Sequence, residues 1–159
     1  MPELSIAPLY DDRVSEFLKL ARVGHLATAS DDANPHNVPL CFWFDGAGHF
    51  YFVIDQKPKR RTGLKLKRMR NIAANSRVAL LIDHYEEDWS YLAYVLVHGS
   101  ARMVDDANEY MLALRNLRDK YPQYRAMALS LAYNPMVRID AERVHVWGER
   151  FAPPPAKPA

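Results

Sequence analysis

Six stretches of this chain either alternate between hydrophobic and polar residues or form short apolar runs, and both patterns are typical of strands. The predicted strands are residues 25–30, 36–44, 49–54, 77–85, 89–104 and 137–147. Elsewhere apolar residues recur every three or four positions, which predicts helices. The predicted helices span about residues 11–22, 64–74, 106–121 and 122–131. The pattern therefore predicts a mainly β fold with inserted helices, of the α+β class.

The order of the strands indicates how the sheet closes. The turn at residues 45–48 joins the second and third strands as a hairpin, and antiparallel strands in this number favour a closed or partly closed barrel. The fifth strand is apolar on both faces, so we expect the barrel interior to cover one face and a helix or a second subunit to cover the other. Gly99 in this strand predicts a bulge.

Length and composition indicate one soluble domain. The 159 residues, of which 49% are hydrophobic and 25% charged, fit a single domain over residues 1–150, followed by a Pro-rich tail at 151–159 that we expect to be disordered. The single cysteine, Cys41, lies in an apolar run and is expected to be a small buried residue. No signal peptide and no apolar stretch of about 20 residues is evident, so we expect a cytoplasmic protein without a membrane partner.

Positive charge is concentrated in one segment. Residues 57–70 contain eight of the 21 lysines and arginines and no acidic residue. Taking these eight away from the net charge of +2 leaves −6, so the rest of the chain is mildly acidic. Like charges packed this closely repel each other unless an anion lies among them. The segment is therefore either a solvated surface or an anion-binding site.

Three details favour a small phosphorylated ligand. The acidic partners expected three or four residues away are missing. Thr62 and Gly63 stand where a helix would begin, and a helix N-terminus offers free N–H groups to phosphate. Lys65 and Arg68 are three residues apart and project together. Nucleic acid is the rival anion, but no aromatic residue for base stacking occurs within 57–70, so we expect no nucleic-acid partner.

Other chemistry has little support in the sequence. The six histidines lack the spacing of a local metal site, and with one cysteine we expect no metal. No nucleophile elbow, Walker loop or dinucleotide-binding glycine motif is present. The catalytic residues therefore stay unknown at this stage.

The order of the segments resembles the pyridoxamine 5′-phosphate oxidase-like family over residues 11–148. Within that family, K-P-K-R-R-T at 57–62 and D-H-Y-E-E-D-W at 83–89 resemble the branch that uses the deazaflavin coenzyme F-420. The resemblance implies a six-stranded antiparallel split β-barrel like that of flavin reductases, paired as a homodimer with the cofactor groove at the interface. The matching segments are G-H-L-A-T-A-S at 24–30, P-H-N-V-P-L at 35–40, H-F-Y-F-V-I-D at 49–55, K-R-M-R-N-I at 67–72, S-R-V-A-L-L-I-D at 76–83 and H-G-S-A-R-M at 98–103.

The same resemblance implies which residues hold the cofactor. Family members bind its phosphate with basic and hydroxyl side chains after the third strand, and the second subunit reaches over the planar ring. Residues 68–72 match the family's K/R-x-R-N-I/L motif, whereas the register within 57–67 stays open. Trp89 and residues 147–150 are the candidates for the reach over the ring. The implied phosphate-binding residues are Lys57, Lys59, Arg60, Arg61, Thr62, Lys65, Arg68 and Asn71.

The implied function is that of an oxidoreductase. Coenzyme F-420 carries several anionic groups along its length and FMN carries one phosphate, so eight basic residues suit F-420 better. The expected reaction is hydride transfer from the deazaflavin to a small conjugated organic substrate that the sequence does not identify. The alternatives are an FMN-dependent oxidase or reductase of the same family and a non-catalytic protein that binds a flavin or a tetrapyrrole.

Overall fold

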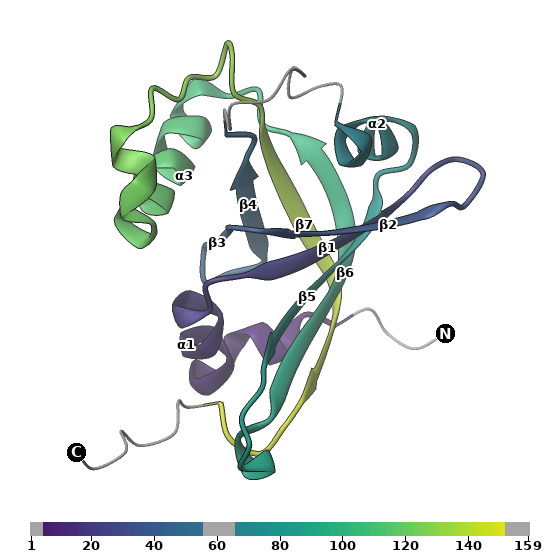
Figure 1. The fold of residues 1–159 in the computed structure, drawn as a ribbon, viewed down its shortest axis with the longest axis vertical. Coiled ribbons are helices and arrows are strands. Elements are labelled where there is room, and N and C mark those ends of the chain that lie inside the picture. Colours follow the sequence, from purple (N-terminus) through teal and green to yellow (C-terminus); the bar gives the residue numbers. More distant parts are fainter. Residues whose placement is uncertain (1–4, 56–65, 152–159) are drawn as a thin grey trace.

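The computed structural model describes residues 5–55 and 66–151, which form a strongly curled antiparallel sheet with helices packed around it (Figure 1). The described residues contain seven strands, in the sheet order β2-β1-β5-β6-β7-β4-β3. The α+β class is therefore confirmed. The strands are β1 Gly24–Ala29, β2 Pro35–Leu40, β3 Trp43–Phe44, β4 His49–Val53, β5 Arg77–His84, β6 Ala93–Met103 and β7 Met136–Trp147. The helices are α1 Asp12–Leu20, α2 Lys67–Ala74 and α3 Ala107–Lys120, with short 3-10 helices η1 Ala7–Tyr10, η3 Trp89–Tyr91 and η4 Pro122–Ala126.

Two hydrophobic cores lie on the two faces of β4. Phe50 and Phe52 point into the main core, which the inner faces of the strands share with α1 and α2. Tyr51 and Val53 point the other way, into a second core that α3 and η4 cover. Because successive side chains of a strand point to opposite faces, β4 is buried on both sides. Figure 1 shows α2 and α3 toward one end of the sheet.

The strand predicted over residues 36–44 is interrupted, which is why seven strands replace the expected six. β2 pairs with β1, whereas β3 pairs with β4 and forms the short hairpin. Between them, the Phe42 N–H donates to the Tyr121 hydroxyl (3.2 Å) and its carbonyl accepts from the Lys120 ammonium (3.1 Å). Side chains at the end of α3 thus take the backbone groups that a continuous ladder would have used.

Two further predicted elements differ from the structure. The strand expected over 89–104 begins only at Ala93, because the Asp88 carboxylate accepts from the Ser90 N–H (3.0 Å) and folds residues 89–91 into η3. The helix expected over 122–131 is limited to the 3-10 turn η4. The remaining predicted helices and strands are present with ends that shift by one to three residues.

Gly99 marks a bulge, as the sequence predicts. The pairing of β6 with β7 shifts between His98, which faces Arg143, and Gly99, which faces Ala141. A Cβ atom on Gly99 would lie 2.2 Å from the Asp140 carbonyl oxygen, so only glycine allows this approach of the strands.

We expect Gly99→Ala to lower the free energy of unfolding by about 2–3 kcal/mol, because the added methyl group pushes two paired strands apart. Urea unfolding followed by circular dichroism measures the change. Gly48→Ala is the matched control, since its Cβ would meet only the flexible end of Ile6 at 3.2 Å. Equal stabilities for the two variants would show that the bulge tolerates a side chain.

The second face of β6 is only partly covered within one chain. Tyr94 and Leu96 on this face are half-buried, whereas Ala93 and Val95 on the other are buried. The Tyr94 ring stacks on Trp147, with centroids 5.8 Å apart, and Trp147 is 50% exposed. No helix of the described residues therefore buries this face completely.

Candidate functional site

Most of the predicted cofactor residues fall outside the described structure. Three of the nine, Arg68, Asn71 and Trp89, lie in described elements. Of the tail predicted over 151–159, residues 152–159 are also outside, whereas Phe151 packs edge-on against Phe17 with centroids 5.5 Å apart. The predictions outside the described residues are Lys57, Lys59, Arg60, Arg61, Thr62 and Lys65.

Arg68 lies in the first turn of α2, near the end of the basic segment 57–70. Its side chain is half-buried, and its Nε atom is buried without a hydrogen-bond partner among the described residues. Burial lowers the pKa of Arg68, while the nearby Asp55 and Tyr124 act in the opposite direction. A guanidinium has five N–H donors and no acceptor, so the donors that have no partner suit an anion. The geometry thus fits a phosphate held between α2 and the end of β4.

Asp55 and Tyr124 lie near Arg68, and Cys41 lies beside Tyr124, an arrangement that the sequence did not reveal. Asp55 follows β4, and Tyr124 in η4 is 5% exposed. Burial raises the pKa of Tyr124, and the neighbouring Cys41 and Asp55 raise it further. No sequence signal links these residues, because they lie on three elements far apart in the chain. Arg68 therefore has a carboxylate and a phenol nearby, and the Cys41 thiol lies behind the phenol.

Asn71 has a structural contact. It is 2% exposed, and its side-chain N–H donates to the Thr28 hydroxyl at 3.0 Å. This bond ties α2 to β1 and fixes the direction in which the first turn of α2 presents Arg68. A direct contact of Asn71 with a cofactor stays a prediction.

Trp89 lies far from Arg68 within one chain. α2 precedes the start of β5 and η3 follows its end, so eight residues of strand, or about 25 Å, separate them. Trp89 is 70% exposed. A single chain therefore does not bring Trp89 and Arg68 to the same small ligand.

Lys120 forms a second unusual cationic site, at the end of α3. Its ammonium donates to the Phe42 carbonyl (3.1 Å) and lies 3.9 Å from the centre of the Phe42 ring. Burial, and then the nearby Arg22, lowers the pKa of Lys120 to about 7. Tyr121 beside it donates to the Arg22 carbonyl (2.9 Å). This cluster fastens α3 to the interruption between β2 and β3.

The lowered pKa of Lys120 predicts a pH dependence of stability. Between pH 7 and 10 the unfolded chain binds more protons than the folded one, so the free energy of unfolding rises with pH in this window. Partial solvent screening reduces the effect, so we expect Lys120→Met to remove about 1 kcal/mol of this rise between pH 7 and 9. Urea unfolding at both pH values measures it, with Lys19→Met on the exposed side of α1 as control. Parallel profiles for wild type and Lys120→Met would contradict the assignment.

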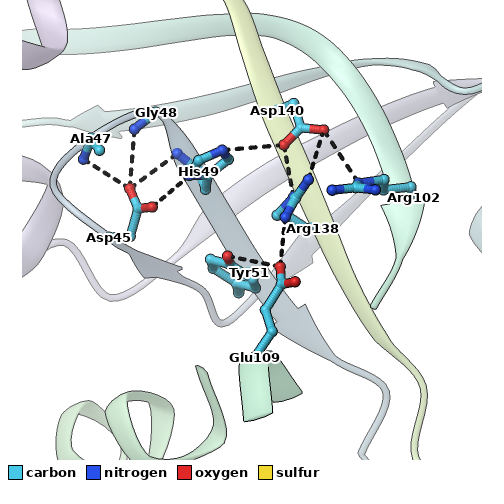
Figure 2. A network of polar contacts seen from close by, with 9 residues as sticks. All are labelled: Asp45, Ala47, Gly48, His49, Tyr51, Arg102, Glu109, Arg138 and Asp140. Carbon is cyan, nitrogen blue, oxygen red and sulfur yellow. Dashed lines mark hydrogen bonds and ion pairs between the residues drawn. The ribbon is translucent and has the colours of Figure 1, made fainter. Parts of the chain in front are cut away.

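A network of charged side chains joins β4, β7 and α3, as Figure 2 shows. Arg138 is its centre: its Nη1 lies 2.7 Å from Glu109 Oε1 and its Nε lies 2.8 Å from Asp140 Oδ1. The Tyr51 hydroxyl donates to the same Glu109 oxygen at 3.0 Å. Burial, and then Glu109, raises the pKa of Tyr51 to about 12. The network holds α3 against the outer face of β4.

The other half of the network orders the turn before β4. The His49 ring lies between two carboxylates, 2.6 Å from Asp45 and 3.4 Å from Asp140. Desolvation acts to raise the pKa of Asp45, but N–H groups of Ala47 and Gly48 and the His49 ring outweigh it, so the pKa is lowered. These residues lie at the start of β4, whereas Asp55 follows its end. We assign this network to the stability of the fold.

Two features are absent from the described residues, a membrane-spanning helix and a metal-binding cluster. Within residues 5–55 and 66–151, no helix is long and apolar enough to cross a membrane. Across the same ranges, no group of three or more His, Cys, Asp and Glu side chains is placed to hold a metal ion.

Comparisons with known proteins place this geometry in a family. A sequence model described as pyridoxamine 5′-phosphate oxidase matches residues 11–146. A 5a,11a-dehydrotetracycline/5a,11a-dehydrooxytetracycline reductase of Streptomyces rimosus is 26% identical over 133 residues, which are 83% of this chain and 78% of the reductase.

Solved structures share the fold. A FAD-binding protein of Mesorhizobium loti superimposes with a TM-score of 0.62 at 23% identity, over 90% of this chain and 94% of that one. The haem storage protein HutZ of Vibrio cholerae superimposes with a TM-score of 0.65 at 14% identity, over 87% of this chain and 94% of that one. The sequence model matches residues 11–146, most of the chain, and shows that the chain belongs to the pyridoxamine 5′-phosphate oxidase family.

Proposed function

We propose that this protein is an oxidoreductase that binds coenzyme F-420 and reduces a small conjugated organic substrate. The observation that carries the proposal is Arg68, a half-buried guanidinium whose Nε lacks a partner among the described residues. Its place at the start of α2, within the basic segment 57–70, suits an anionic cofactor. When bound, the reduced deazaflavin supplies the hydride; this chain supplies binding, orientation and a surface that excludes water.

The amount of positive charge supports F-420 over FMN. One phosphate is satisfied by two or three cationic groups, and residues 57–70 carry eight. F-420 has a phosphodiester and a glutamate tail, which extend its negative charge along a line. We infer that Lys57, Lys59, Arg60, Arg61, Thr62 and Lys65 contact this extended anion together with Arg68.

The reductase of Streptomyces rimosus supports a reductive reaction. Its substrates are dehydro compounds, as its name states, and it matches most of this chain. We therefore propose that the substrate of this protein contains a conjugated double bond that accepts the hydride.

We also propose a homodimer in which the partner completes the site. The half-covered face of β6 and β7, with Tyr94, Leu96 and the 50% exposed Trp147, supports it. Trp89 lies too far from Arg68 to act on the same ligand within one chain, but a partner subunit could bring its own copy to the ring. Analytical ultracentrifugation of the purified protein tests the dimer.

FMN is the alternative cofactor. A FAD-binding protein shares the fold, and the FMN phosphate would also suit Arg68. The protein would then be an FMN-dependent oxidase or reductase of the same family.

A non-catalytic protein that binds a flavin or a tetrapyrrole is the second alternative, which the fold shared with a haem storage protein supports. Tight binding without turnover would favour it.

A turnover assay tests the proposed function. Reduced F-420 and, separately, reduced FMN are mixed with the protein and a panel of conjugated enones, and oxidation of the cofactor is followed by absorbance. We expect protein-dependent oxidation with F-420 and an enone that the Arg68→Glu variant lacks. Turnover with FMN alone would select the first alternative, and no turnover with either cofactor would favour the second.

A further inference from the structure

A separate cavity of about 370 Å³ lies at the end of β5 opposite to α2. It is enclosed by the end of α1, the segment before β1, the end of β5, Tyr91 of η3 and the residues after β7. This volume falls within the range of about 300–1,000 Å³ that is common for small-molecule sites. It does not include Arg68, and Arg150 is the one lining residue that the family resemblance also relates to the cofactor.

The walls of this cavity are largely aromatic and aliphatic. Phe17 and Phe151 form an edge-to-face pair on one side. Leu20 and Val23 line it while 55% and 44% exposed, respectively. Burial of such side chains by a ligand is favourable, and the ring edges of an aromatic pair prefer another aromatic surface. The walls therefore favour a flat apolar molecule.

The polar groups of the cavity carry a positive excess. Arg150 donates to the Tyr91 hydroxyl (3.2 Å) and lies 5.1 Å from the centre of its ring. Arg22 donates to the Lys120 carbonyl (2.8 Å). Each guanidinium has five N–H donors, so these contacts leave donors for a ligand. The one lining carboxylate, Asp83, lies 3.4 Å from the His25 ring, so the two arginines still exceed it by one charge.

His84 adds a further polar position. It lines the same cavity, and its Nε2 atom is buried without a hydrogen-bond partner in the part of the chain that the structure describes. A ligand that forms a hydrogen bond with this buried atom removes the free-energy cost of leaving it without a partner.

We propose that this cavity binds an aromatic small molecule that carries one anionic group, such as an aryl carboxylate or sulfonate. The apolar walls take the ring, and the arginines at the rim take the anion. The proposal rests on charge complementarity and wall chemistry, and it requires neither F-420 nor FMN.

The test uses 8-anilinonaphthalene-1-sulfonate as the probe, titrated into the full-length protein without added cofactor and followed by its fluorescence. We expect one saturable site per chain. Leu20→Glu places a carboxylate in the exposed part of the apolar wall, and Arg150→Glu reverses the charge at the rim. Each is expected to weaken the binding by at least about fivefold.

Leu112→Glu on α3 is the matched control, because Leu112 is 47% exposed in another depression that also contains arginines. Wild-type affinity in this control supports the assignment to the cavity beside α1. Loss of binding in the control but not in Leu20→Glu would overturn it, as would equal affinities in all variants. Competition distinguishes the ligand class, and naphthalene-1-sulfonate is expected to displace the probe. Equal displacement by 1-naphthalenemethanol would show that no anionic group is needed. Equal displacement by dodecanoate would show that no aromatic ring is needed.

Discussion

Replacing Arg68 with Glu is expected to weaken cofactor binding by at least about a hundredfold. Hydrogen bonds to charged groups contribute about 1.5–3 kcal/mol each, and two of them to a phosphate account for this factor before the added repulsion. Arg68 is the described residue of the basic segment with an unpartnered buried donor, so it carries more of the binding than exposed cations do. Fluorescence titration of F-420 and FMN with the purified variant measures the loss.

Arg70→Glu is the control for this prediction, because Arg70 is exposed on the same helix and receives the same change of charge. We expect its affinity to fall by less than about fivefold in physiological salt. Arg68→Gln, which keeps much of the shape, separates loss of binding from loss of folding when its thermal unfolding is compared with wild type. Unchanged affinity in both Arg68 variants would show that the cofactor does not bind at Arg68.

Replacing Arg138 with Met is expected to lower the free energy of unfolding by about 2–4 kcal/mol. Its side chain is 15% exposed and bridges Glu109 and Asp140 (Figure 2). Its removal leaves the partly buried Glu109 without its counter-ion and leaves Asp140 with only the more distant Arg102 and the His49 ring. Urea unfolding measures the loss. Arg102→Met is the control, because Arg102 is 60% exposed and lies 3.5 Å from the same Asp140; we expect a change below about 1 kcal/mol.

A double substitution decides whether the network acts as one unit. If the Glu109 carboxylate lowers the free energy of unfolding only when Arg138 is missing, the double variant Arg138→Met, Glu109→Gln recovers part of the lost stability. Additive losses would show that the two residues act independently.

The sequence predicts the strands and helices well where local pattern determines them. β1, β5 and β7 follow their alternation, and Gly99 marks its bulge, because side-chain periodicity and glycine geometry act over a few residues. The interruption at Phe42 has no local signal, since its backbone partner Tyr121 lies 79 residues away. The strand predicted over 89–104 includes Trp89 because the apolar residues on its two faces begin there, but the Asp88 carboxylate favours a turn.

The site is predictable only in part for the same reason. Arg68 follows from charge and from the family motif. Asp55 and Tyr124, which act on the Arg68 guanidinium, reach it through the packing of α2, β4 and η4. The pairing of Asn71 with Thr28 is likewise a tertiary contact between α2 and β1. The sequence pattern therefore identifies Arg68 as a candidate, and tertiary packing determines which residues lie around it.

The most direct test of the proposed function is a parallel titration of the purified protein with F-420 and with FMN at two salt concentrations. We expect tight F-420 binding that weakens as salt rises, because several exposed cations contribute, and much weaker binding of FMN. Tighter binding of FMN would make the protein a flavin enzyme of its family. Binding of neither cofactor would contradict the proposed function and leave Arg68 and the basic segment to another anion.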